Sequence, residues 1–193
     1  AKVITLFLIA GLVPLAVMGV ISNNSSSNAL KQQAFNQLVS VRETKKKQIE
    51  DYFSTIRKQV RTFSENGMIV DAMKGFKTSF NEVRKQNDIT DSKLEEYRTA
   101  LKTYYTNDFT NEYKQQNNGQ GPDAVSFFSQ LDADSLALQY YYIKANHNQL
   151  GEKHNLDASD EVSSYSKLHA KYHPAIRDFL EQFGYYDIFL VDP

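Results

Sequence analysis

The sequence contains no cysteine and no tryptophan, and it has only 8 glycines and 4 prolines among 193 residues. The absence of cysteine excludes disulfide bonds, thiolate metal sites and a cysteine nucleophile. Because glycine and proline interrupt helices, their scarcity favours long helices over a sheet of many strands. We therefore expect a mainly α-helical chain.

An excess of charge of one sign is also absent, since 22 basic residues face 23 acidic ones and the net charge is −1. This balance gives no electrostatic reason to expect nucleic acid as a partner. The sequence also has no glycine-rich phosphate loop, no arrangement of Ser, His and carboxylate, and no carboxylate pair in an identifiable cleft. We predict no catalytic residue and no cofactor, and so not an enzyme.

The four histidines are His147, His154, His169 and His173. His169 and His173 lie four residues apart and would share one face of a helix, as zinc ligands do. The stretch "HAKYH" has no glutamate next to its first histidine, and no third ligand is evident. We interpret all four as structural or solvent-facing residues and predict no metal site.

The one long apolar run is Val3 to Ile21, about 19 residues without a charge. As a helix it would span roughly 29 Å, close to the apolar thickness of a bilayer. A cleaved signal peptide would have a shorter core and a small-x-small site, whereas "GVISNNSSS" offers no convincing Ala-x-Ala. We predict a transmembrane anchor at residues 1–22. The scarce flanking charges, Lys2 and Lys31, only mildly favour a cytoplasmic N-terminus.

After the anchor, apolar residues from Ala29 to Phe63 recur at steps of three or four, with a mean near 3.7 once Lys45 is counted. This spacing predicts a long stalk helix that is fairly straight or only weakly supercoiled. Its apolar stripe suggests that two copies pair as a homodimer. The stripe consists of Leu30, Ala34, Leu38, Val41, Ile49, Phe53, Ile56, Val60 and Phe63.

Further amphipathic segments predict a bundle of shorter helices. We expect Gly67 to cap the C-terminus of the stalk, Ser92-Lys-Leu-Glu95 to form a capping box, and Gly184 to end the last helix. Pro174 would kink that last helix or mark a fresh start. The apolar run Ile188 to Val191 predicts a strand. The helices expected are Met68–Val83, one from about Ser92, one from about Asp134 to Asn146, and Glu161–Phe183.

Three consecutive tyrosines, Tyr140, Tyr141 and Tyr142, lie in "LQYYYIKANHNQLGEKH". Successive side chains of an α-helix point in three directions, so at most one or two of them should face the core. They either pack between helices with their hydroxyls at the rim or form the aromatic wall of a ligand pocket. Our candidate ligand-binding residues are Tyr140, Tyr141, Tyr172 and Tyr186.

Several stretches together are similar to one family. They are "FNQLVSVRETKKKQIEDYF", "QVRTFSENGMIVDAM", "LQYYYIKANHNQLGEKH" and "YSKLHAKYHPAIRDFLEQFGYYDIFLVDP". With the N-terminal anchor, they resemble the extracytoplasmic sensory region of bacterial methyl-accepting chemotaxis proteins, which some membrane-bound sensor kinases and cyclases share. The likeness runs from Phe35 onward, and its most specific part is Tyr165 to Pro193.

This resemblance implies a protein of the bacterial inner membrane whose residues after about Ser22 lie in the periplasm. Residues 23–183 would be a helical sensory module, and residues 184–193 would begin a PAS-like (Cache-type) domain, with "YYDIFLVDP" as its first strand. A small-molecule ligand is possible. The alternatives are the input region of a sensor histidine kinase or cyclase, and a membrane-anchored helical protein that does not signal.

Overall fold

The computed structural model describes residues 2–191, apart from the side chain of Phe127, and nearly all of its regular structure is helical. The chain forms two units, Ala1–Thr62 and Phe63–Pro193. This confirms the expectation of a mainly α-helical protein with a long apolar N-terminal helix.

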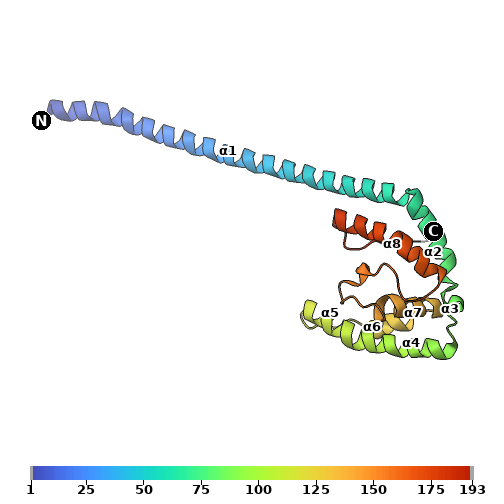
Figure 1. The fold of residues 1–193 in the computed structure, drawn as a ribbon. Helices are drawn as coiled ribbons and strands as arrows, with labels where there is room; N and C mark the ends of the chain where they lie inside the picture. Colours follow the sequence, from blue (N-terminus) through green and yellow to red (C-terminus); the bar gives the residue numbers. More distant parts are fainter. Residues whose placement is uncertain (1, 192–193) are drawn as a thin grey trace. The chain divides into compact units, whose positions relative to one another are not determined.

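The first unit is a single helix, α1, which runs from Lys2 to Ser64 and ends just inside the second unit (Figure 1). Pro14 lies inside it without ending it. The polar stretch 22–28, which the apolar pattern does not predict to be helical, continues the helix. Because this stretch contains Ser and Asn but no Gly or Pro, its cost in helix propensity is modest. The apolar N-terminal segment and the predicted stalk are therefore one unbroken helix.

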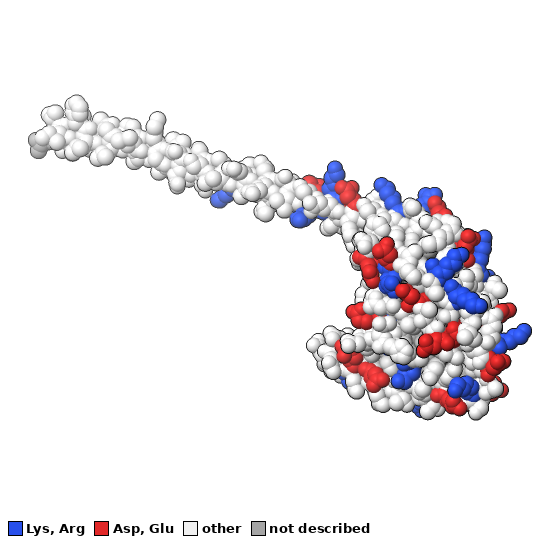
Figure 2. All heavy atoms as spheres, in the orientation of Figure 1, with Lys and Arg blue, Asp and Glu red and all other residues white. Residues whose placement is uncertain are grey.

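The N-terminal part of α1 is long and apolar enough to cross a membrane, and none of that apolar segment is buried in this structure. On the face drawn in Figure 2, only uncharged residues cover this part of the helix. The stalk stripe is exposed as well, because Leu38, Val41 and Ile49 each keep more than half of their surface accessible. Within the first unit, nothing covers either apolar surface.

The second unit packs short helices around one core. Leu101 of α4, Leu136 of α7 and Val83 of α3 have the largest fully buried apolar side chains. The helices are α2 (Gly67–Phe80), α3 (Val83–Gln86), α4 (Asp91–Tyr104), α5 (Thr110–Gln116), α6 (Ala124–Ser129), α7 (Ala133–Gln139) and α8 (Ser164–Phe183). Two π-helical turns follow α4 and α7, at Tyr105–Phe109 and Tyr140–Lys144, and a 3₁₀ turn spans Lys153–Asn155.

α2 and α8 pack closely against each other. A Cβ on Gly75 would lie only 2.9 Å from a methyl group of Leu168, so the glycine allows this approach. Phe76 of α2 packs against Tyr165 and Tyr172 of α8, with ring centroids 5.1 and 6.4 Å away. At the end of α1, Phe63 stacks on Phe179 of α8 with centroids 4.2 Å apart. α8 therefore contacts both the last turn of α1 and the helix that follows it.

The helix caps differ from two of our predictions. Gly67 does not cap the C-terminus of the stalk but is the first residue of α2, where Asn66 is the N-cap and accepts a hydrogen bond from the Met68 amide. α4 is capped by Thr90, whose hydroxyl accepts from the Lys93 amide, so the Ser92 capping box was wrong. Thr90 has the extended backbone that an N-cap requires, whereas Ser92 already lies inside the helix.

α8 begins at Ser164, three residues later than expected, because Ser163 caps it by accepting hydrogen bonds from the amides of Tyr165 and Ser166. Pro174 lies within one continuous helix. Gly184 ends the helix as predicted, since its φ of 66° is left-handed and its amide turns back to Glu181. The amide of Tyr185 bonds to Leu180, which completes a Schellman-type end.

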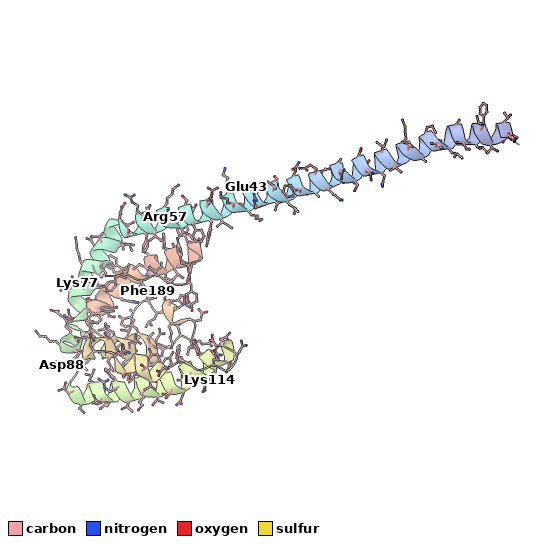
Figure 3. The ribbon with its side chains drawn as sticks, turned by 180° about the vertical axis from the view of Figure 1, so that it is seen from behind. Glu43, Arg57, Lys77, Asp88, Lys114 and Phe189 are labelled. Atoms are coloured by element: carbon pink, nitrogen blue, oxygen red, sulfur yellow. The ribbon has the colours of Figure 1, made fainter. Side chains whose placement is uncertain are left out.

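The strand expected at Ile188 to Val191 was wrong, because residues 2–191 contain no strand. Ile188 and Leu190 are half-buried, whereas Val191 and Phe189, which is labelled in Figure 3, are exposed. The alternation that suggested a strand is real, but it arises where irregular chain lies along a groove beside α2 and α8. No neighbouring strand is present in the described residues to form a ladder, so this structure shows no PAS-like strand.

Candidate functional site

The tyrosine wall consists of Tyr97 on α4 and of Tyr140 and Tyr141 on the π-helical turn after α7. The rings of Tyr97 and Tyr140 stack in parallel with centroids 3.8 Å apart. Tyr141 meets Tyr97 edge-on at 5.6 Å, and the two hydroxyls share a hydrogen bond of 2.9 Å. These contacts fix the three rings as one surface.

All three consecutive tyrosines pack against the core, although an α-helix would have turned at least one of them away. The π-helical turn explains the difference. Because an i→i+5 turn holds more residues than an α-turn, successive side chains are separated by smaller angles. Tyr142 uses this geometry to contact Tyr165 and His169 of α8, with ring centroids 5.5 and 4.6 Å away. Tyr142 therefore packs between helices, whereas Tyr140 and Tyr141 form part of an aromatic wall.

A cavity of about 320 Å³ lies against the tyrosine wall. Its other sides come from Lys93 on α4 and from the docking loop, which we define as residues 145–163 between the π-turn and α8. The loop contributes both apolar and polar groups. They include Ala145, His147, Leu156, Ala158 and Asp160. The size is at the lower end of the range for small-molecule sites.

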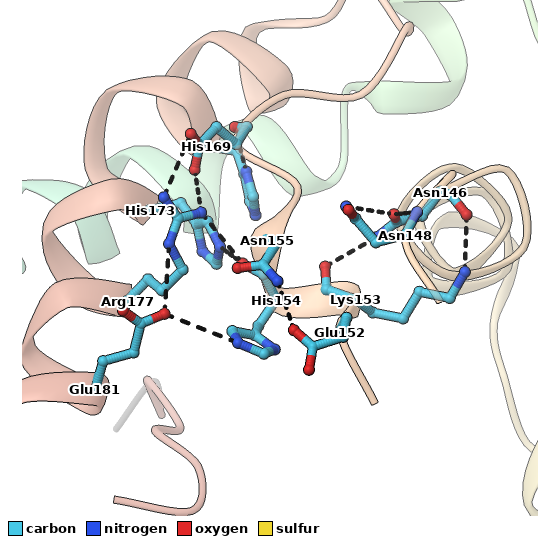
Figure 4. A network of polar contacts seen from close by, with 11 residues as sticks. Asn146, Asn148, Glu152, Lys153, His154, Asn155, His169, His173, Arg177 and Glu181 are labelled. Carbon is cyan, nitrogen blue, oxygen red and sulfur yellow. Dashed lines mark hydrogen bonds and ion pairs between the residues drawn. The ribbon is translucent and has the colours of Figure 1, made fainter. Parts of the chain in front are cut away.

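Asn146 fixes the start of the docking loop. It is only 5 % exposed, and its amide group donates to the carbonyls of Tyr142 and Lys153, both at 2.9 Å. Its side-chain oxygen accepts from the backbone and side chain of Asn148. Lys153 Nζ donates in return to the Asn146 carbonyl at 2.7 Å (Figure 4). Every donor and acceptor of this amide is used, so Asn146 serves the loop rather than a ligand.

The far side of the docking loop is held by a polar row on α8, formed by His169, His173 and Arg177 at four-residue spacing (Figure 4). His169 Nδ1 lies 2.8 Å from the Asp157 carbonyl, and His173 Nε2 lies 2.6 Å from the His154 carbonyl. Because a carbonyl can only accept, both ring nitrogens are donors. Arg177 forms an ion pair with Asp157. The loop that closes the cavity is thus attached directly to α8.

Burial and hydrogen bonding shift the pKa of several groups in and around the wall. Burial, followed by the hydrogen bond to Tyr97, raises the pKa of Tyr141, and burial raises the pKa of Tyr142 to about 12. The hydrogen bond and charge of Glu96 raise the pKa of Lys93, which therefore stays a cation. Burial lowers the pKa of His169 to about 4. The cavity therefore combines tyrosine side chains with the cation of Lys93, and Asp160 also lines it.

The structure brings together two of the four candidate tyrosines. Tyr140 and Tyr141 line the cavity. Tyr172 is buried elsewhere, between α8 and Phe76 of α2, and Tyr186 is fully exposed. His169 and His173 do share a helix face, with stacked rings 4.3 Å apart. Within the described residues, no group of three His, Cys, Asp or Glu side chains is placed to hold a metal ion.

No family model matches the chain, and no curated protein or solved structure shows significant similarity to it. The resemblance to chemoreceptor sensory regions stays a prediction from the sequence. Function must therefore be inferred from the geometry of each unit.

A second hollow, of about 630 Å³, is the groove beside α2 and α8 in which Ile188 and Leu190 lie. Met73, Phe76 and Phe80 give it a mostly apolar floor, and His169 and His173 form part of its edge. Because the chain's own residues 188–190 already form one side, the groove is less clearly a ligand site than the cavity at the tyrosine wall.

Sequence reasoning missed both Lys93 and Tyr97 as site residues. Both lie more than 40 positions before the tyrosine triplet, and only the packing of α4 against α7 and its π-turn brings them together. The available signal was their four-residue spacing, which puts a cation and an aromatic ring on one face of α4. In the structure, Lys93 Nζ lies 5.6 Å from the centre of the Tyr97 ring.

Proposed function

We propose that the chain is the membrane-anchored sensory region of a bacterial chemoreceptor, which passes a periplasmic stimulus towards the cytoplasm. The observation that carries the proposal is the continuity of α1. Its apolar segment, suited to a bilayer, and its 29–63 stalk belong to one helix without a break. A displacement imposed on the stalk has no flexible joint in which to dissipate before the membrane segment.

The second unit supplies what an input module needs. A ligand-sized cavity is closed by the docking loop, and the same loop is bonded to α8 through His169, His173 and Arg177. α8 in turn stacks Phe179 on Phe63, in the last turn of α1. A change at the cavity therefore has a continuous series of packed contacts through which to reach α1, which is the physical requirement for coupling.

The exposed stripe of the stalk supports pairing with a second copy. Leu38, Val41 and Ile49 repeat on one face, each more than half exposed. A membrane anchor would confine identical chains in parallel, and two identical stripes could then cover each other along their length. This arrangement would give the stiff element with two packings of similar energy that switching requires.

Cysteine crosslinking tests the pairing without background, because the chain has no cysteine of its own. In membranes of cells that make the protein, Val41→Cys and Ile49→Cys should form disulfide-linked dimers readily. Glu43→Cys and Asp51→Cys, on the opposite face of the same helix turns, are matched controls and should crosslink several-fold less. Equal crosslinking at all four positions would contradict the paired stripe.

Signalling is tested in the same cells by swimming behaviour. The double change Val41→Ser with Ile49→Ser removes apolar contacts without altering charge, and we expect it to shift the baseline frequency of direction reversal. Asn36→Ser, at an exposed position on the opposite face of the stalk, is the control and should leave it unchanged. If the double variant alters neither swimming nor dimerisation, the stalk does not transmit, and a membrane-anchored protein without a signalling role becomes the better description.

A further inference from the structure

The cavity at the tyrosine wall carries opposite charges on different elements. The ammonium of Lys93 lies on α4, beside the wall. The carboxylate of Asp160 lies on the docking loop, with His147 Nε2 at 3.8 Å. Both charged side chains keep access to water, since the Lys93 side chain is 51 % and the Asp160 side chain 94 % exposed. Lys93 Nζ also lies 3.3 Å from a Glu96 carboxylate oxygen, so each charged group would exchange a solvated ion pair for an occupant of the cavity.

The interior between these charges is compact and carries both apolar and polar surface. The stacked rings of Tyr97 and Tyr140 provide a flat surface, and Leu156 and Ala158 face it from the loop. A planar or short apolar body can pack against such rings. The linked hydroxyls of Tyr97 and Tyr141 add one polar point within the wall. Asn146 contributes no free amide, because its hydrogen bonds are already complete.

We propose that this cavity binds a small zwitterion, which carries a carboxylate and a cationic nitrogen at opposite ends of a compact apolar body. The carboxylate meets Lys93, the cationic nitrogen meets Asp160, and the body lies on the tyrosine wall. The role of this binding as a stimulus rests on the proposed function, whereas the binding itself does not.

Ligands whose charges all have the same sign fit these groups less well. A dicarboxylate would place its second anion near Asp160, and a diamine would place its second cation near Lys93. Like charges at close range oppose binding, and opposite charges favour it. Because both groups are solvated, each correct pairing should add a modest factor of about five in affinity and weaken with salt. The binding free energies of the two pairings add, so only a zwitterion gains both.

Three probes that each contain a benzene ring separate the contributions of the two charges to binding. They are 4-(aminomethyl)benzoate, 4-methylbenzoate and benzylamine. The first carries both charges, the second only the anion and the third only the cation. Binding to the detergent-solubilised full chain is measured by calorimetry or by ligand-observed NMR. We expect the zwitterion to bind at least about fivefold more tightly than either of the other two.

Charge-specific variants then assign each contact. Lys93→Gln should weaken binding of the two carboxylate probes and leave benzylamine unaffected. Asp160→Asn should weaken binding of the two amine probes and leave 4-methylbenzoate unaffected. Lys102→Gln on α4 and Asp71→Asn on α2, both exposed and away from the cavity, are matched controls that should change nothing. Unfolding curves of all four variants check that the fold is retained.

Equal affinity for the three probes, or no binding of 4-(aminomethyl)benzoate, would overturn the inference. So would a loss in Lys93→Gln that is the same for benzylamine as for the carboxylates. The crosslinking and swimming assays do not depend on these probes. A negative binding result with positive stalk assays would therefore refute the zwitterion site alone, and the reverse result would refute the signalling role alone.

Discussion

The surroundings of His169 constrain its protonation state. Its Nδ1 donates to the Asp157 carbonyl, and its ring stacks on His173 and contacts Tyr142. Asp157 and Glu161 favour the protonated form, but burial and the neighbouring His173 oppose it, with burial the largest effect. The outcome is a pKa of about 4, below the ordinary value of 6.5. The folded protein therefore holds this imidazole neutral at physiological pH.

This gives a pH dependence of stability. The unfolded chain binds a proton at His169 near pH 6.5, whereas the folded chain does so only near pH 4. The contribution of His169 is thus complete above pH 6.5 and is lost as the pH falls towards 4, by on the order of 2 kcal/mol after allowance for partial exposure. Urea unfolding at pH 7.5, 6, 5 and 4 measures it.

The matched variant is His169→Asn, whose side-chain amide can still donate to the Asp157 carbonyl but does not titrate. We expect its free energy of unfolding to fall less steeply between pH 6.5 and 4 than that of the wild type. His147→Asn, at an exposed position, should follow the wild-type curve. Parallel curves for wild type and His169→Asn would show that His169 is not the group responsible.

At the scale of single elements, helix ends depend on backbone conformation. Gly184 has a φ of 66°, and an added methyl group would meet no neighbour within 4 Å, so the cost of Gly184→Ala is conformational alone. We expect a loss of about 1 kcal/mol in the free energy of unfolding. Thermal or urea unfolding measures it.

Gly67→Ala is the natural control, because Gly67 lies in the first turn of α2 with an ordinary backbone and equally open space. There the same change should be neutral or stabilising by a few tenths of a kcal/mol. Two variants with identical chemistry should therefore shift stability in opposite directions. A loss at both positions would mean that the methyl group, rather than the left-handed conformation, causes the effect.

The elements also show what the sequence could and could not reveal. Apolar periodicity predicted α2, α4 and α8, because a helix that packs on a core must repeat its buried face locally. Caps were less predictable, since Thr90 and Ser92 are both chemically suitable and only the backbone conformation, which is extended at Thr90, distinguishes them. The strand predicted at Ile188 to Val191 was wrong because alternating apolar side chains show only that one side of a segment is covered. Here α2 and α8, and not a neighbouring strand, lie on that side.

The candidate site was predictable only in part, for a similar reason. Tyr140 and Tyr141 stood out because they are adjacent in the chain. Tyr97 and Lys93 join them through tertiary packing, and the π-turn that orients the triplet leaves no clear mark in the sequence. Tyr186 was a poor candidate because proximity to an apolar run does not make a pocket, and its side chain is fully exposed.

For the whole molecule, the decisive question is whether the apolar segment of α1 resides in a bilayer. Leu8→Arg with Val13→Arg places two charges within that segment, and each costs about 2.5–3.5 kcal/mol near the centre of a membrane helix. We expect the double variant to be lost from the membrane fraction. Leu38→Arg with Val41→Arg puts the same charges on the stalk and should leave membrane association intact.

A tag at the N-terminus separates an anchor from a cleaved signal sequence, because both are long, apolar and N-terminal. An anchor keeps the tag on the membrane-bound chain at full apparent mass. A signal sequence releases it, and the remaining protein is then found in the soluble fraction. That result would also remove the basis for transmission through α1.

Because α1 is unbroken through residues 22–28, the side chains of the apolar segment and those of the stalk stripe lie at a fixed angle to each other around the helix axis. In an α-helix each residue advances that angle by about 100°. One extra residue in this stretch would rotate the stripe by about 100° relative to the apolar segment. Four extra residues would leave a net rotation of only about 40°. The number of residues in the polar stretch therefore determines the rotation of the stalk stripe relative to the apolar segment.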